Sequence, residues 1–333
     1  MSETHLSLAH GNGGRLMREL IEQLFKPALG NPQLDTQVDA APLPDWQGEP
    51  VVSTDGFTVQ PLEFPGGDIG SLAVHGTVND LAVSGALPRY LTLNAFLEEG
   101  LEIELLRRLI GSIGTAARAA GVLVVAGDTK VVGHGDCDGV YLASTGIGVR
   151  QPGVQLGLQH IRPGDRVLVS GPVGEHGAAV LLARESFGLR GQLRSDAASI
   201  LPEARALWSL PGVRFMRDPT RGGVATVLHE IARACGCSLS VSEAAIPVRS
   251  EVRSVCELLG FDPLYLACEG RLVAVVGADA AEAALRALRG VAPEATLIGA
   301  VGEGTAGQVV LETGFGGRRL LDELEEEPLP RIC

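Results

Sequence analysis

Residues 102–130 read EIELLRRLIGSIGTAARAAGVLVVAGDTK, and the fold class follows from the order of the patterns within them. Apolar residues recur at helical spacing over 102–120, which predicts an amphipathic helix. The apolar run GVLVVA at 121–126 predicts a short buried strand that stops at Gly127-Asp128. A helix followed directly by a buried strand is the unit from which α/β proteins are built.

The same alternation continues on both sides of this stretch. On the N-terminal side the patterns predict a helix at 14–25, a strand at 49–54 that ends at Asp55, a helix at 70–86 and a strand at 90–97. A further strand is expected at 139–148. Turn sequences then interrupt the pattern at 151–153 and 162–165.

A second α/β unit follows the interruption. Its expected elements are strands at 166–170, 271–276 and 296–301 and helices at 178–186, 221–235 and 279–289. The 333 residues suit two domains better than one small core. We therefore expect an α/β fold of the α+β type with an N-terminal domain at 1–155, a C-terminal domain at 156–322 and a tail at 323–333.

The tail ends in EEEPLPRIC, residues 325–333, whose prolines and charges oppose helix formation and packing. None of the six cysteines forms a CxxC pair, so neither a zinc ribbon nor a thioredoxin-like site is indicated. The five interior cysteines are interpreted as small buried hydrophobic residues or inert thiols. Cys333, the last residue, cannot be interpreted in that way. We expect it to carry chemistry.

The formal net charge of −13 argues against nucleic-acid binding, which requires a basic surface. Any bound phosphate would instead be held by metal ions on carboxylates or by backbone N–H groups. The N-terminus lacks the pattern of a signal peptide, and no apolar stretch reaches the ~18 residues of a membrane span. The sequence thus predicts a cytoplasmic protein without a membrane segment.

Four aspartates stand at the ends of expected elements: Asp55, Asp80, Asp128 and Asp218. If the fold brings them together, they suit Mg²⁺, a hard cation that binds carboxylates, phosphates and water. The alternative is that each one caps a helix or fixes a turn. Asp218, before Pro219 and an expected helix, is the clearest candidate for a cap.

The P-loop motif GxxxxGK[ST] occurs nowhere in the sequence. Glycine clusters are the alternative candidates for binding phosphate. His10-Gly-Asn-Gly-Gly14 leads into a helix, and Gly222-Gly223 begins another, so both offer close backbone approach and unpaired N–H groups. Gly66-Gly67 is interpreted as an ordinary turn. The GxGxxG match at 302–307 precedes a strand rather than a helix, which predicts a hairpin loop instead of a dinucleotide site.

Two further residues are candidates for catalysis. Lys130 is one of only two lysines among 27 lysines and arginines, which indicates a position where an ammonium rather than a guanidinium is needed. Glu269, directly before the strand RLVAVV, is a candidate base or an exposed loop carboxylate. His10, His75 and His176 are given no catalytic role, since lone histidines are more often structural.

The motifs in their order are His10-Gly-Asn-Gly-Gly14, Thr54-Asp-Gly56, Val78-Asn-Asp80, Gly127-Asp-Thr-Lys130, Asp218-Pro-Thr-Arg-Gly-Gly223, Cys268-Glu-Gly-Arg271 and Pro330-Arg-Ile-Cys333. This series resembles the HypE family of hydrogenase expression/formation proteins, which are carbamoyl dehydratases. The resemblance covers essentially the whole chain. The glycine motifs are shared with a wider superfamily that includes aminoimidazole ribonucleotide synthetase, selenophosphate synthetase and thiamine-monophosphate kinase.

The resemblance implies a two-domain, aminoimidazole ribonucleotide synthetase-like fold whose N-terminal domains pair in a homodimer. It implies an ATP site between subunits and domains, lined by Asn12, Gly13, Gly14, Asp55, Asp80, Asp128, Thr129, Asp218, Thr220, Gly222 and Gly223. Mg²⁺ would bind the four aspartates.

In the implied reaction HypF carbamoylates Cys333, and ATP-dependent dehydration turns the thiocarbamate into a thiocyanate. The HypC–HypD complex would accept the cyanide for the iron of [NiFe]-hydrogenase. Glu269 is expected to be the base and Lys130 to orient the group or stabilise charge, although the sequence leaves the two roles interchangeable.

Two other functions stay open at this point. The first is a small-molecule kinase or synthetase of the same superfamily. Selenophosphate synthetases carry their reactive Cys or selenocysteine in an N-terminal glycine-rich loop, whereas residues 1–20 here contain no cysteine. The second is a non-catalytic carrier that only presents Cys333, which would have no use for four aspartates, Lys130 and Glu269.

Overall fold

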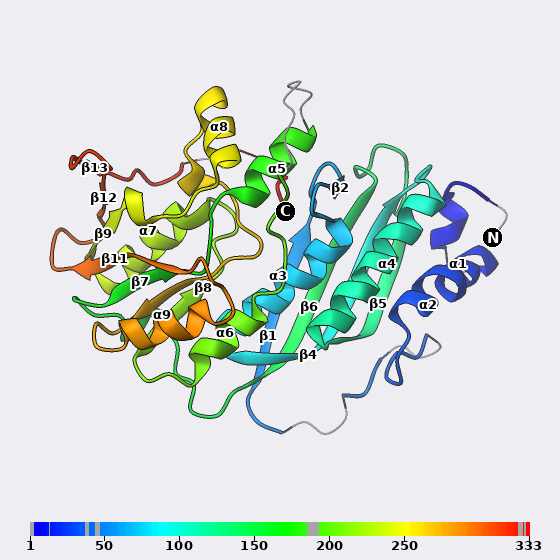
Figure 1. The fold of residues 1–333 in the computed structure, drawn as a ribbon. Coiled ribbons are helices and arrows are strands. Elements are labelled where there is room, and N and C mark those ends of the chain that lie inside the picture. Colours follow the sequence, from blue (N-terminus) through cyan, green and yellow to red (C-terminus); the bar gives the residue numbers. More distant parts are fainter. Residues whose placement is uncertain are drawn as a thin grey trace.

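Two mixed sheets organise the chain, one in each half, as Figure 1 shows. The computed structural model describes residues 3–12, 14–36, 40–43, 47–184, 193–325, 329 and 331–333. Among these residues no helix is both long and apolar enough to cross a membrane.

The sheet of the N-terminal half has the order β1-β6-β4-β5. Its strands are β1 (Pro50–Phe57), β4 (Ala86–Glu98), β5 (Leu123–Val132) and β6 (Val140–Arg150). Only β4 and β5 are parallel, because α4 (Ile103–Ala120) connects them as a crossover. The hairpin of β2 (Glu63–Phe64) and β3 (Gly67–Asp68) leads into α3 (Ile69–Val83), whose first N–H groups Asp68 caps.

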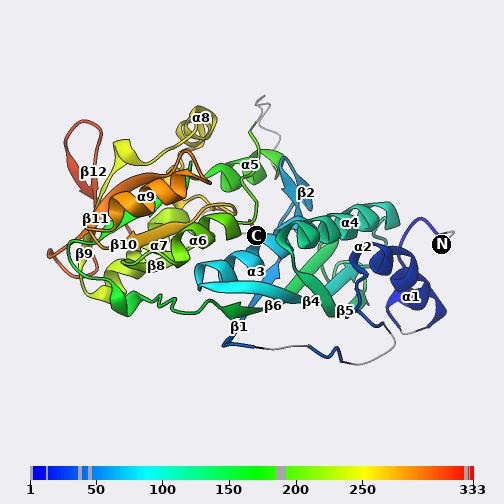
Figure 2. The same cartoon turned by 60° about the horizontal axis from the view of Figure 1, so that its bottom comes forward.

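Helices α3 and α4 cover one face of this sheet, while no helix of the described chain covers the other face (Figures 1 and 2). Helix α4 is amphipathic, buries its leucine and isoleucine stripe and ends at Gly121, whose φ of 70° suits glycine. On the uncovered face Val52 and Phe96 are 62% and 41% exposed. The N-terminal helices α1 (Arg15–Leu20) and α2 (Lys26–Leu29), joined by a π-helical turn, lie beside α4.

The sheet of the C-terminal half has the order β13-β12-β9-β11-β7-β10-β8. Its strands are β7 (Arg166–Val169), β8 (Val213–Arg217), β9 (Ser238–Ser242), β10 (Val273–Val276), β11 (Thr296–Gly302), β12 (Val309–Glu312) and β13 (Arg318–Leu320). Helix α7 (Gly223–Cys235) packs on one face, and α6 (Leu201–Trp208) and α9 (Ala281–Arg289) pack on the other.

The two halves share apolar contacts. Helices α5 (Glu175–Arg184) and α8 (Ser250–Leu259) contribute buried residues to the same core as the N-terminal sheet. In the opposite direction, Ala82 and Val83 at the end of α3 pack into the core beneath α6 and α9. The junction is therefore an apolar interface, which holds side chains from both halves in fixed positions.

The helices and strands expected from periodicity are present, with some changes at their ends. Strands β1 and β5 continue past the predicted ends, so that Asp55 and Asp128 lie within strands rather than after them. The hairpin predicted at 302–307 is wrong: β11 and β12 are not paired with each other, because β9 lies between them. Helices α6 and α8 and strands β8 and β9 were not predicted, since their patterns are short or broken.

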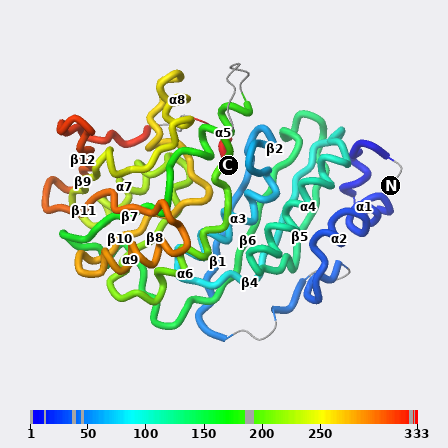
Figure 3. Tube along the Cα trace, viewed as in Figure 1, coloured from blue at the N-terminus to red at the C-terminus, as the bar shows by residue number. Residues whose placement is uncertain are grey.

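The tail differs most from its prediction. Prolines and charges suggested a segment that does not pack, yet Leu329 and Ile332 are only 5% and 2% exposed. The backbone N–H of Thr58 donates to the Cys333 carbonyl at 3.0 Å, and that of Gln60 donates to the Arg331 carbonyl at 3.3 Å. Backbone hydrogen bonds to residues just beyond β1 and the burial of Leu329 and Ile332 thus hold the tail in place in spite of its prolines and charges. The chain ends at the junction of the halves (Figure 3).

Candidate active site

Four carboxylic acids gather at the junction of the two halves. Asp55 points from β1 toward α3, where it shares a hydrogen bond with Asp80. The hydroxyl of Ser53, two residues before Asp55 on the same face, donates to Asp80 at 2.5 Å. Asp218 follows β8 and Glu269 precedes β10, and both are buried. The C-terminal half therefore contributes Asp218 and Glu269, whose carboxyls lie near those of Asp55 on β1 and Asp80 on α3.

Burial and repulsion by neighbouring carboxylates raise the pKa of Asp55, Asp218 and Glu269. Burial, followed by the neighbouring charge of Asp80, raises the pKa of Asp55 to about 6 and that of Asp218 to about 7. Burial, then the charges of Asp218 and Asp196, raise the pKa of Glu269 well above its usual value. Oxygen Oε1 of Glu269 has no hydrogen-bond partner among the described residues. Such a cluster attracts a cation or a proton donor.

The alternative that Asp218 is a helix cap is wrong. Helix α7 begins at Gly223, and its N-cap is Gly222, with a φ of 71°. A Cβ at Gly223 would lie 2.5 Å from the Leu264 carbonyl oxygen, so only glycine allows this close approach. The N–H of Thr220 turns back to the Asp218 carbonyl at 3.1 Å. The two glycines thus direct the N-terminus of α7 toward the carboxylates.

A second group of predicted residues lies on β5. The Lys130 ammonium is 3.3 Å from the Asp128 carboxylate, and both side chains are more than half exposed. Thr129 between them is buried, and its N–H donates to Asp128 at 2.9 Å. The glycine-rich N-terminal loop packs alongside, because a Cβ at Gly11 would lie 2.5 Å from the Val131 nitrogen.

Within that loop the N–H of Gly14 donates to the Asn12 side chain at 3.2 Å. Gly14 is also the N-cap of α1. Gly13 lies outside the described residues. The loop and the Asp128–Lys130 segment therefore form one group, made only by the N-terminal half.

The two groups do not meet within one chain. Strands β1 and β5 are opposite edges of the sheet, three strand spacings or about 14 Å apart. The register aligns Asp55 with Gly127, one residue before Asp128. Asp55 faces α3, whereas Asp128 and Lys130 share the uncovered face with Phe96. Of the four predicted metal ligands, the fold brings together three. No three His, Cys, Asp or Glu side chains in the described ranges are arranged to hold a metal ion.

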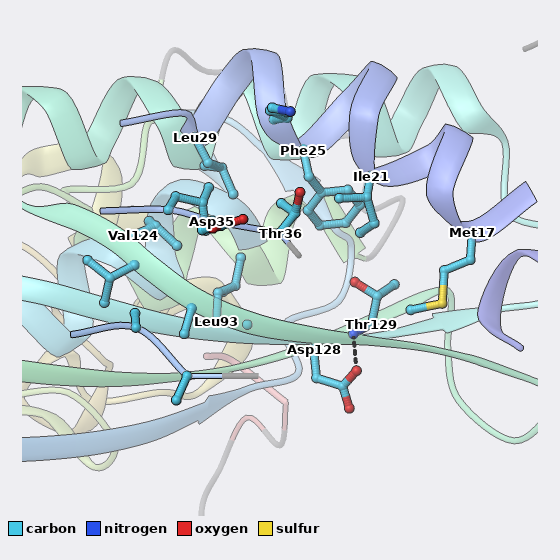
Figure 4. Close-up of a pocket in the computed structure, with 17 residues that line it drawn as sticks. Met17, Ile21, Phe25, Leu29, Asp35, Thr36, Leu93, Val124, Asp128 and Thr129 are labelled. Carbon is cyan, nitrogen blue, oxygen red and sulfur yellow. Dashed lines mark hydrogen bonds between the residues drawn. The ribbon is translucent and has the colours of Figure 1, made fainter. Parts of the chain in front are cut away.

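A cavity of about 220 Å³ lies beside Asp128 and Thr129, between the N-terminal helices and β5. In Figure 4 Phe25, Ile21 and Leu29 face β5 across this space. The lining combines apolar side chains with the polar side chains of Lys26, Asp35, Thr36, Asp128 and Thr129. The cavity can accept a flat apolar group next to a carboxylate and a hydroxyl.

Family models for AIR synthase related protein match the chain in two parts, the N-terminal domain over residues 38–150 and the C-terminal domain over residues 162–312. The carbamoyl dehydratase HypE of Azotobacter vinelandii is 48% identical over 331 residues, which make up 98% of this chain and 97% of that protein. The chain belongs to the HypE family of carbamoyl dehydratases.

Solved structures of the HypE family agree with this membership. One is the hydrogenase maturation protein HypE in complex with ATP, with a TM-score of 0.94 and 46% identity over 98% of this chain and 100% of that one. Another is a chain of the HypE–HypF complex, with a TM-score of 0.81 and 42% identity over 92% and 99% of the two chains. A thiamine-monophosphate kinase from Stenotrophomonas maltophilia, 20% identical with a TM-score of 0.66, shares the fold alone.

The sequence missed residues that hold Glu269 in place. The Glu269 N–H donates to the buried Asp196 carboxylate at 3.1 Å, and Arg271 lies 3.6 Å from the same carboxylate. The Asn79 amide donates to the carbonyls of Glu269 and Ala198 at 3.2 and 3.0 Å. Asn79 and Arg271 belong to the motifs that carry the resemblance to HypE, whereas Asp196 lies in an irregular stretch that gives no periodic signal.

The crowded carboxylates give a stability prediction. Because the pKa of Asp218 is raised in the folded state, the folded chain binds more protons than the unfolded chain between pH 4 and 7. Stability without metal or nucleotide therefore falls as pH rises through this window. Asp218→Asn should flatten that slope and raise stability at pH 8 by about 1–3 kcal/mol.

Thermal unfolding in EDTA across this pH range measures the effect. Asp279→Asn, at an exposed position, is the matched control and should leave the slope unchanged. A variant Asp218→Asn that is destabilised equally at pH 5 and pH 8 would contradict the electrostatic interpretation.

Proposed function

We propose that this chain dehydrates an S-carbamoyl group on its own Cys333 to a thiocyanate at the expense of ATP. The cyanide so formed would become a ligand of the [NiFe]-hydrogenase iron. One observation carries the proposal: the residue that bears the terminal thiol docks at Thr58, three residues beyond Asp55, where both halves contribute carboxylates. A free-substrate kinase has no use for a cysteine held in this position.

The chemistry requires two steps. The thiocarbamate oxygen attacks the γ-phosphorus of ATP, so that an O–P bond forms and the bond to the ADP oxygen breaks. The nitrogen then loses both of its protons: one is released as the O-phosphorylated intermediate forms, and a base removes the other while the C–O bond breaks, phosphate departs and the C≡N bond forms. Glu269 is the proposed base, because it is a buried carboxyl at the junction whose Oε1 has no hydrogen-bond partner among the described residues, whereas the similarly unpartnered Oδ2 of Asp196 lies 3.6 Å from the Arg271 guanidinium.

The raised pKa of Glu269 sets a condition on this role. A neutral carboxylic acid cannot accept the proton, so Glu269 must be ionised when the thiocarbamate is bound. Burial is the main cause of the raised pKa of Glu269 and repulsion by Asp218 and its neighbours adds to it, so positive charge beside Asp55, Asp80 and Asp218 would lower this pKa. A bound cation and Lys130 are the two sources of that charge that we propose.

Mg²⁺ fits the donor set at the junction. It binds through one or two carboxylates plus phosphates and water, so a cage of three protein ligands is not required. Asp55, Asp80 and Asp218 supply crowded carboxylates that such an ion would relieve. When bound, the ion would neutralise charge on the phosphates of ATP.

A homodimer would complete the site. The uncovered sheet face exposes Val52 and Phe96 together with Asp128 and Lys130. Pairing of these faces buries the apolar side chains and lets β5 and the glycine loop of one copy approach the Asp55 group of the other. Asp128 and Lys130 would then act in trans, which resolves their separation from Asp55 within one chain.

This arrangement predicts complementation between inactive variants. Lys130→Ala disables one half of the shared site and Asp218→Asn disables the other. Each variant alone should be nearly inactive. An equal mixture that is refolded or exchanged together should recover about a quarter of the parent rate, because half of the dimers carry one intact site of two. The rate of thiocyanate formation in the mixture measures this, and a mixture as inactive as its components would contradict a site shared between copies.

The proposed partners follow from the same reaction. A HypF protein would deliver the carbamoyl group, and a HypC–HypD complex would accept the cyanide. Both exchanges need the tail to leave its dock. We place these steps in the cytoplasm, where the cysteines of this chain, none of which is in a disulfide, would stay reduced.

Intact mass spectrometry of the C-terminal peptide tests the proposal. The chain is incubated with HypF, carbamoyl phosphate and MgATP. We expect a carbamoyl adduct on the peptide that ends in Cys333, followed by ATP-dependent loss of one water. An adduct that never loses water would leave only the carrier function, and the absence of any adduct would refute both.

A further inference from the structure

A buried histidine receives the end of the chain. His176, at the start of α5, is fully buried, and its Nε2 lies 2.7 Å from the carbonyl oxygen of Ile332. Its Nδ1 lies 2.8 Å from the hydroxyl of Ser195. The ring of Phe64 meets the imidazole edge-on, with centroids 5.3 Å apart. The imidazole is thus fixed on three sides, and the residue it touches is the neighbour of Cys333.

The hydrogen bonds around Ser195 determine the tautomer of His176. The Ser195 hydroxyl oxygen accepts the Ala197 N–H at 2.9 Å, so its own proton is available for Nδ1. Nδ1 therefore accepts, and Nε2 carries the proton that it donates to Ile332. Burial lowers the pKa of His176 to about 4, which keeps the ring neutral at neutral pH. Every polar atom of the imidazole is used when the tail is docked.

The segment that orients His176 also holds Glu269. Ser195 binds the imidazole, and the next residue, Asp196, accepts the N–H of Glu269 at 3.1 Å. Ala198 donates its N–H to the Glu269 carbonyl at 3.3 Å. The docked tail, through His176, and the proposed base are therefore both attached to one short stretch, 195–198. The positions of Cys333 and of the Glu269 carboxylate therefore depend on the same four residues.

We propose that His176 is a positioning residue for the dehydration step: by donating to the Ile332 carbonyl it fixes the docked tail, so that the group on Cys333 meets Glu269 in one geometry. The inference rests on the proposed function. It does not require His176 to touch the reacting atoms. The hydrogen bond from His176 matters to only one of the two half-reactions. Loading by the donor protein takes place with the tail released, whereas dehydration requires the tail to be docked.

Two substitutions of His176 and one control test the inference. His176→Ala removes the donor and leaves Ile332 without its partner. His176→Gln keeps a side-chain N–H that can reach the same carbonyl. Leu181→Ala truncates another buried side chain of α5 without removing a donor and controls for a general loss of packing. All three are loaded by HypF with carbamoyl phosphate, and dehydration is then started with MgATP in a single turnover.

We expect His176→Ala to load at the parent rate and to dehydrate on the order of 10-fold more slowly, the effect of one lost hydrogen bond to a buried group. The KM for ATP should not change. His176→Gln should recover most of the dehydration rate, and Leu181→Ala should match the parent. Carboxypeptidase should release Cys333 faster from His176→Ala than from Leu181→Ala, because the tail spends more time undocked.

Loading and dehydration that slow together in His176→Ala would overturn the inference, as would dehydration at the parent rate. Equal losses in His176→Ala and Leu181→Ala would assign His176 a structural role only. If the parent chain itself is never carbamoylated, the proposed function fails instead. The two failures are therefore distinguished by the parent protein.

Discussion

Cys333→Ala protein should accept no carbamoyl group from HypF and form no thiocyanate, while ATP should bind as it does to the parent chain. We expect this result because the thiol is the acceptor itself, and Cys268, the cysteine next to Glu269, is fully buried, which raises the pKa of its thiol and keeps it from the donor protein. The nucleotide site should persist, since none of the residues proposed to bind ATP depends on the Cys333 side chain. Intact mass measures loading, and calorimetry measures nucleotide affinity.

Cys235→Ala is the matched control for loss of a thiol. Cys235, at the end of α7, is partly exposed, as is Cys333. Burial raises its pKa to about 11, so it is a weaker nucleophile than an ordinary thiol at neutral pH. The Cys235→Ala protein should load fully. A carbamoyl adduct on Cys333→Ala protein at any other residue would contradict the carrier assignment.

The sequence contained the chemistry of the site but not its arrangement. Asp55, Asp80 and Asp218 stood out because they follow or interrupt apolar patterns, and the fold places these three of the four predicted aspartates close together. Lys130 stood out by composition, and it is indeed exposed beside Asp128. The sequence did not indicate that Asp128 belongs to a different edge of the sheet, because strand order depends on long-range pairing. The local apolar pattern does not predict which strands pair with each other.

The tail and its receptor were missed for a related reason. Composition describes residues 325–333 as unable to pack, yet hydrogen bonds between residues 331–333 and 58–60 hold the end in place. The segments that supply these partners are about 270 positions away in the sequence. His176 and Asp196 likewise act through neighbours from distant segments, and neither has a motif of its own.

Substitution of Glu269 tests the division of labour between Glu269 and Lys130. Glu269→Gln keeps the size and hydrogen-bonding shape of the side chain but removes its ability to accept a proton. Dehydration should fall by about 10²- to 10⁴-fold, the usual contribution of a positioned general base. Loading should continue, so that the carbamoyl adduct and its O-phosphorylated form accumulate on Cys333 in the presence of MgATP.

The fate of ATP distinguishes the base from a charge stabiliser. With Glu269→Gln, phosphoryl transfer to the thiocarbamate oxygen can still occur, since that step moves no proton to Glu269. Single-turnover ADP release should therefore exceed thiocyanate formation. With Lys130→Ala both should fall together, because the ammonium is proposed to act on charge in the phosphoryl transfer itself. Glu203→Gln, at a partly buried glutamate on α6 whose pKa burial also raises, is the control and should behave as the parent. The opposite pattern, with ADP release lost in Glu269→Gln and retained in Lys130→Ala, would exchange the two roles.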